Sequence, residues 1–117
     1  MRWFAPRIGG QKWRVDLVRP KHPAFGGDNV HGMTLHDKCQ VYIATGYEED
    51  TLSSTAVHEV FGHASFHVAG VSQIIIDLCG GDEAKAETVE EEMIRRLELV
   101  WYPMFRELGF RFPKVNQ

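Results

Sequence analysis

Cysteine is scarce in this sequence, long apolar runs are absent, and basic residues do not outnumber acidic ones. The two cysteines, Cys39 and Cys79, are too few for a disulfide scaffold, so we expect free thiols in a reducing, cytoplasmic compartment. No apolar run approaches the length of a membrane span, and the first seven residues lack the apolar core of a secretion signal. Thirteen Lys and Arg against sixteen Asp and Glu give a net charge of −3. We therefore expect neither a membrane nor a nucleic acid as a partner.

The chain of 117 residues is long enough for one domain and contains neither a linker nor a repeat. We predict an α+β fold that is β-rich over residues 1–47 and helical over 48–110. Alternating apolar residues and flanking turn residues predict three strands, the last two joined by a hairpin turn at 36–38: 12–18, 31–37 and 39–44.

The second half of the chain shows helical patterns. A helix is expected from residue 51 to 68, because apolar residues recur there without an internal proline. Residues 71–79 are expected to form an apolar loop or a short turn. A long helix is expected over 83–102, with acidic residues at its start and basic residues further on, as the helix dipole favours. Pro103 is expected to kink or break it, with a short helix continuing over 104–108.

The segment that carries chemistry reads His58-Glu59-Val60-Phe61-Gly62-His63. It resembles the zinc-binding helix of the zincin metallopeptidases, whose common form is H-E-x-x-H. Two histidines four apart lie about 40° apart on one helix face, so both can reach one ion. Here the histidines are five apart, which a regular helix would separate by about 140°. A π-bulge would absorb the extra residue and restore the register, and Gly62 would tolerate it.

The same H-E-x-x-x-H form occurs in the dipeptidyl peptidase III family. The resemblance implies that His58 and His63 bind Zn²⁺. It also implies that Glu59 accepts a proton from a metal-bound water, so that the protein hydrolyses a protein or peptide substrate.

The order of elements over residues 8–110 is similar to that of small gluzincins, namely the minigluzincins and the phage-type repressor-cleaving peptidases. The resemblance implies a zincin-like domain: a small twisted sheet packed on a zinc-binding helix and a glutamate helix. It also implies a third ligand from the later helix, which by register is Glu91. Those families often carry an acidic or amide residue four positions further on, where this chain has Arg95.

Other glutamates of the later helix remain candidates for the third ligand. Shifting the register by one turn makes Glu87 the ligand and Glu91 its supporting residue. A further shift makes Glu83 the ligand, in a segment that resembles one of dipeptidyl peptidase III. Helical geometry adds Glu90, which lies near the centre of the apolar face around Ile94.

Three alternatives stay open at this point. His63 and His67, four apart and aligned with Glu59, could be the ligand pair on an undistorted helix. The fold could serve as a catalytically inactive gluzincin-like binding or structural module. The histidines could also be ordinary partly buried side chains.

In the enzyme hypothesis, residues 41–45 would form the strand edge that pairs with extended substrate, and His31 or His36 could stabilise an oxyanion near the cleft.

Overall fold

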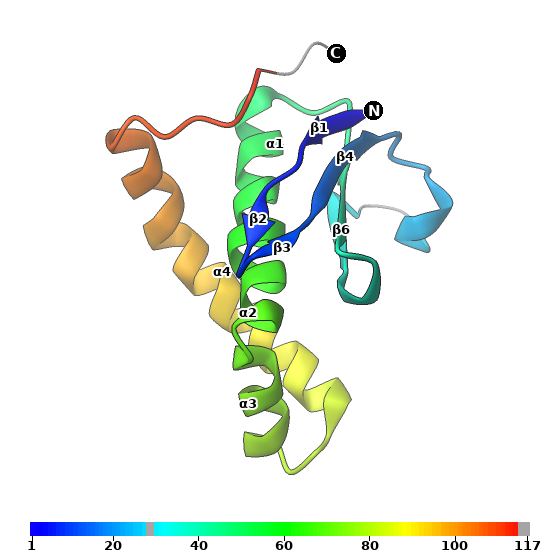
Figure 1. Ribbon diagram of the computed structural model, residues 1–117, viewed down its shortest axis with the longest axis vertical. Coiled ribbons are helices and arrows are strands. Elements are labelled where there is room, and N and C mark those ends of the chain that lie inside the picture. The colour runs from blue at the N-terminus through cyan, green and yellow to red at the C-terminus, as the bar shows by residue number, and fades with distance from the viewer. Residues whose placement is uncertain (28–29, 115–117) are drawn as a thin grey trace.

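The computed structural model describes residues 1–27 and 30–114, which form the predicted α+β fold (Figure 1). Four strands form the main sheet in the order β1-β4-β6-β5: β1 Arg2–Phe4, β4 Arg14–Val18, β6 Gln40–Ala44 and β5 Gly32–Leu35. β4 and β6 run parallel, and the other pairs are antiparallel. The strand predicted at 12–18 is divided, because β3 Gln11–Lys12 pairs with β2 Arg7–Ile8 in a separate ribbon. The hairpin turn is confirmed as a 3₁₀ turn, η2 His36–Lys38, and a second such turn, η1 Pro23–Phe25, precedes β5.

The position of β6 in the sheet corrects one prediction. Residues 41–45 were predicted to form a free edge, but β6 pairs with β4 on one side and with β5 on the other. Val41 and Ile43 are fully buried, as an interior strand requires. The edge strand on this side of the sheet is β5.

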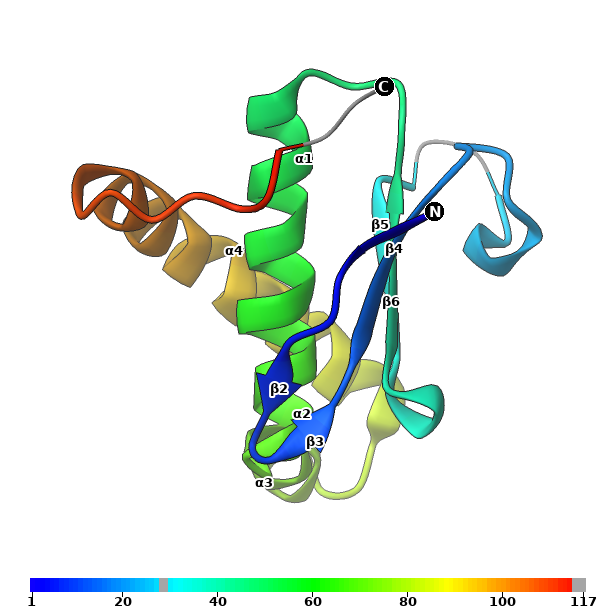
Figure 2. The ribbon, with the colours of Figure 1, turned by 45° about the horizontal axis from the view of Figure 1, so that its top comes forward.

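The predicted helix over 51–68 is confirmed as one continuous central helix with three parts. They are α1 Glu49–Ala56, a π-helical segment η3 Val57–Ala64, and α2 Ser65–Val68. Figure 2 shows this helix alongside the sheet, viewed nearly edge-on. A four-residue apolar repeat, at positions 52, 56, 60 and 64, is buried against Trp13, Val15 and Ile43 of the sheet layer. This contact is the hydrophobic core.

Residues 71–78 form a helix, α3 Val71–Leu78, so the predicted loop is wrong. The β-branched run Ile74-Ile75-Ile76 has modest helix propensity, but Ile75 is buried and α3 packs on the following helix. Tertiary packing therefore outweighs local preference here. Gly70 precedes α3 in a left-handed conformation that a residue with a side chain rarely adopts.

The helix predicted over 83–102 and the short helix predicted over 104–108 form one continuous helix, α4 Glu83–Glu107, so the helix does not break at Pro103. Proline leaves the carbonyl of Leu99 without its helical donor, and Leu99 is exposed, so water can bond that oxygen. Asp82 caps the helix by accepting a hydrogen bond from the Lys85 amide. α4 crosses the central helix at η3 (Figure 1). Within the described ranges, no helix is long and apolar enough to cross a bilayer.

Candidate metal centre

The π-helical segment brings His58 and His63 together, as the five-residue spacing predicts. A π-helix bonds residues five apart, so side chains five apart return to the same face. The Ser65 amide bonds the Val60 carbonyl five residues earlier, and the Ser65 hydroxyl bonds the same oxygen at 2.8 Å. The two imidazole rings lie 5.0 Å apart between centroids.

Gly62 has a role beyond tolerating the π geometry. A Cβ atom at this position would lie 2.5 Å from Cγ2 of Ile94 on α4, well inside van der Waals contact. Glycine therefore allows α4 to approach the central helix closely. Glu91 lies on α4 one turn before Ile94, and this approach brings it within reach of both histidines.

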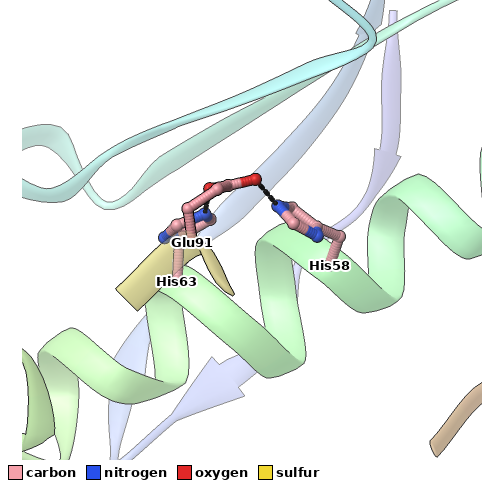
Figure 3. A group of neighbouring side chains, drawn as sticks. All are labelled: His58, His63 and Glu91. Carbon is pink, nitrogen blue, oxygen red and sulfur yellow. Dashed lines mark hydrogen bonds and ion pairs between the residues drawn. The ribbon is translucent and has the colours of Figure 1, made fainter. Parts of the chain in front are cut away.

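Glu91 spans the two histidines with its two carboxylate oxygens (Figure 3). Oε1 lies 2.8 Å from Nε2 of His58, and Oε2 lies 2.7 Å from Nε2 of His63. One ligand atom from each of the three residues lies within 4.8 Å of the others, close enough for a single metal ion. Among the described residues this is the one such group of His, Cys, Asp or Glu.

Each histidine contacts a second carboxylate through its other ring nitrogen. Nδ1 of His58 lies 2.9 Å from Glu98, whose other oxygen accepts a hydrogen bond from Ser54 at 2.7 Å. In the same way, Nδ1 of His63 lies 2.7 Å from Glu90. Both rings are therefore held in orientation by carboxylates of α4.

Glu90 is itself fixed by the helix that the sequence did not predict. Its other oxygen accepts a hydrogen bond from the hydroxyl of Ser72, in the first turn of α3. Glu90 and Glu98 thus have equivalent roles: each carboxylate contacts one histidine with one oxygen and one serine hydroxyl with the other.

The histidines and glutamates of the cluster shift one another's pKa values. Burial opposes the charged form of His63, but hydrogen bonds from the ring to Glu90 and Glu91 outweigh it and raise the pKa of His63 to about 9. Burial likewise opposes protonation of His58, yet Glu98 and neighbouring carboxylates raise its pKa. The pKa values of Glu90 and Glu98 are lowered by their histidine partners, against the opposing effect of burial.

The number of ring protons decides how well a metal fits. A neutral imidazole has one N–H, and an ionised carboxylate only accepts hydrogen bonds. Each ring here faces carboxylates at both nitrogens, so without a metal each ring can donate to two ionised carboxylates only as an imidazolium. A cation bound at Nε2 of both rings would leave each ring neutral, with Nδ1–H donating to Glu98 or Glu90. That is how metal-binding histidines are usually oriented. Two imidazoles and one carboxylate also match the ligands of catalytic zinc, which keeps a fourth position open.

Glu59 lies beside this cluster and is almost fully buried, with 5% of its surface exposed. Burial raises its pKa, and the imidazoles of His63 and His58 only partly oppose this. Its carboxyl group accepts a hydrogen bond from Thr34 Oγ1 on β5 at 3.3 Å. Gly32 makes room for it, because a Cβ atom there would lie 2.9 Å from Cγ of Glu59.

Two cavities meet at Glu59, His63 and Glu91, between the edge strand β5 and α4. One, of about 580 Å³, extends toward α3, and we call it the α3 cavity. The other, of about 470 Å³, extends past His58 toward Arg95, and we call it the Arg95 cavity. The candidate metal centre is therefore open to a ligand from two sides.

The remaining candidates lie outside the cluster. Glu83 and Glu87 are exposed and line the α3 cavity, but neither belongs to the group of side chains that could hold one ion. His67 stacks on His36, with ring centroids 4.3 Å apart, so the alternative pair of His63 and His67 is not brought together around Glu91. His31 lines the Arg95 cavity, and His36 lines the α3 cavity.

The residue missed by the sequence analysis is Glu98. It contacts Nδ1 of His58, whereas the position four after Glu91 is Arg95. Glu98 comes seven residues after Glu91, which is two helical turns and the same helix face. This seven-residue spacing is the sequence feature from which Glu98 could have been predicted.

Comparison of the chain with protein-family models, with curated proteins and with solved structures finds no match in any of the three.

Proposed function

We propose that this protein is a zinc-dependent metallopeptidase that hydrolyses a peptide or protein substrate. The observation that carries the proposal is the combination of two carboxylate-oriented histidines, a carboxylate that spans them, and a buried carboxyl group next to them. Glu59 contributes little to the fold, because within the described ranges its one side-chain hydrogen bond is long and its burial is costly. A buried, poorly satisfied carboxyl group beside a cluster of ligands is typical of a catalytic acid or base.

In this proposal His58, His63 and Glu91 hold the zinc ion. Zinc, when bound, supplies Lewis acidity, which makes a water molecule more acidic and polarises a peptide carbonyl. Glu98 and Glu90 keep Nδ1 of each histidine protonated and Nε2 free to bind. They are positioning residues, since neither reaches the reacting atoms.

Glu59 is the proposed general base. Its carboxylate accepts a proton from the attacking water and then passes it to the nitrogen of the leaving amine. Burial holds its pKa above the ordinary value, which strengthens the carboxylate as a base. Thr34 donates a hydrogen bond to Glu59 and keeps the carboxyl group aligned from the side of β5.

The edge strand β5 is the proposed binding site for an extended peptide. The Ala44 amide bonds the His31 carbonyl, so hydrogen-bonded pairing with β6 recurs at Met33 and Leu35. The backbone groups of Gly32 and Thr34 therefore point away from β6. A peptide strand can pair with these groups and lie across Glu59.

The test compares wild type with Glu59→Gln, which keeps the shape of the side chain but cannot accept a proton. Both proteins are loaded with zinc and incubated with a random peptide library, and fragments are followed by mass spectrometry. We expect equal zinc content and a loss of cleavage of about a hundredfold to ten-thousandfold. Glu92→Gln is the control, because Glu92 pairs with Arg96 on the solvent side of α4.

Full activity in Glu59→Gln would exclude the general base. Zinc binding without cleavage by the wild type would instead favour the inactive gluzincin-like module.

A further inference from the structure

The two cavities that meet at the candidate metal centre differ in charge. The α3 cavity is lined by five glutamates and by no Lys or Arg. The Arg95 cavity is lined by three glutamates and by Arg95, the one Lys or Arg in the lining of either cavity. This inference rests on the proposed function and concerns which substrate groups the two cavities accept.

Arg95 is poorly satisfied by the protein. Its side chain is 67% exposed, and its one ion pair within the described ranges joins Nε to Oε1 of Glu91 at 3.5 Å. Glu98 lies close to Arg95 but already uses both oxygens, one toward His58 and the other toward Ser54. The terminal nitrogens of the guanidinium are therefore free to bind a ligand.

A metal ion would make Arg95 still more available. Glu91 is the residue that Arg95 contacts and also the proposed metal ligand. A cation bound to the Glu91 carboxylate would therefore weaken the attraction between Glu91 and the Arg95 guanidinium. With a divalent ion present, the Arg95 cavity carries three positive and three negative formal charges. The α3 cavity would then keep a net negative charge of three. An anionic group is repelled from the α3 cavity and tolerated in the Arg95 cavity.

We propose that Arg95 binds a carboxylate of the substrate and so determines specificity at this site. The guanidinium presents a planar fork of donors that matches a carboxylate in two parallel hydrogen bonds. The carboxylate comes either from the C-terminus of the peptide or from an acidic side chain. Either source places the carboxylate in the Arg95 cavity, one helical turn from Glu91, and the scissile bond beside Glu59.

The test uses three N-acetylated random peptide libraries and zinc-loaded protein. The first has free C-terminal carboxylates, the second is amidated at the C-terminus, and the third is amidated and lacks Asp and Glu. We expect wild type to cleave the first about tenfold or more faster than the third, as a charge-assisted pair allows. The second library separates the sources, since fast cleavage there identifies an acidic side chain.

Arg95→Gln should abolish this preference by raising KM, with zinc content unchanged. The matched control is Arg96→Gln, because Arg96 also pairs with a glutamate four residues earlier but faces solvent outside both cavities. A second readout is binding of the best acid peptide and its amide to zinc-loaded Glu59→Gln protein by calorimetry. The amide should bind about tenfold more weakly, and adding Arg95→Gln should remove the difference.

Cleavage without preference for a carboxylate, or a preference that survives in Arg95→Gln, would overturn the assignment of Arg95 and leave the peptidase proposal intact. Absence of cleavage of all three libraries by zinc-loaded wild type would overturn the proposed function, and this inference with it.

Discussion

The central helix packs against two neighbours, and the two contacts differ in chemistry. Toward the centre of the sheet it presents apolar side chains, such as Leu52 and Ala56, which are buried against Trp13, and toward the edge strand β5 it presents Glu59. Toward α4 it presents His58 and His63, which meet three carboxylates. The apolar contact needs nothing from solution to be stable. The polar contact needs protons or a cation, because carboxylates crowded together without compensation repel one another.

One helix can therefore hold the fold with one face and bind a ligand with the other. The π-helical segment makes this division possible, since it turns residues five apart onto one face while Val60 and Ala64 stay in the core. Changes in metal or pH should therefore act on the contact with α4 and leave the contact with the sheet intact.

The largest effect should come from filling the space between the central helix and α4. Gly62→Leu places a side chain where Ile94 already lies, so α4 must move away. We expect a loss of about 1–3 kcal/mol in the free energy of unfolding, as for other overpacked interiors, together with loss of zinc binding. Denaturant unfolding and metal analysis measure the two effects.

Gly27→Leu is the matched control for this substitution, since a Cβ atom at Gly27 meets nothing within 4 Å. If Gly62→Leu bound zinc like the wild type, the close approach of α4 would not be what forms the site.

A smaller effect is expected from removing the carboxylates that orient the histidines. Glu98→Gln and Glu90→Gln should each weaken zinc binding about tenfold to a hundredfold, because an amide does not hold the Nδ1 proton as strongly. Competition with a chromogenic chelator measures the affinity. Glu92→Gln should bind zinc normally, because Glu92 lies outside the cluster. Equal affinity in all three variants would remove the positioning role.

A further effect is a pH dependence of the metal-free protein. The pKa of His63 is about 9 in the folded protein and about 6.5 in an unfolded chain. Because the folded pKa is the higher one, its contribution to stability is complete below about pH 6.5 and is lost as the pH rises through about 9. Stability should therefore fall across this window.

The raised pKa values of His58 and Glu59 act in the same direction. Chemical unfolding at a series of pH values measures the slope, which His63→Gln should reduce. A slope that is unchanged in His63→Gln would contradict the proposed charge state of this ring.

The histidine pair and its geometry could be predicted because the spacing of the two histidines in the sequence restricts the helix geometry. Two histidines five residues apart, His58 and His63, lie on the same face of a helix only if that helix contains a π-helical turn. The structure has that turn. Glu91 was the first choice among the glutamates of α4, and it is the glutamate that reaches both rings. The α+β class and the strands β4, β5 and β6 also followed from local patterns, whereas β1 and β2 were not predicted.

What could not be predicted depends on contacts between distant segments. Ile75 is buried in α3, which packs on α4, and no local pattern reveals that contact. Ser72 on the same helix then fixes Glu90, so the missed helix also hid part of the site. The order of strands in the sheet, which makes β5 and not β6 the edge, is likewise a property of the assembled fold. Glu98 was missed because the resemblance directed attention to Arg95.

The central claim is that His58, His63 and Glu91 bind zinc, and metal analysis of tag-free protein tests it most directly. Plasma mass spectrometry would compare wild type with His58→Ala, His63→Ala and Glu91→Gln, and with His67→Ala as the control that stacks on His36 outside the cluster. The account predicts about one zinc per chain in wild type and in His67→Ala, and loss in the other three. No zinc in wild type after zinc is added back, or loss in His67→Ala with retention in His58→Ala, would contradict it.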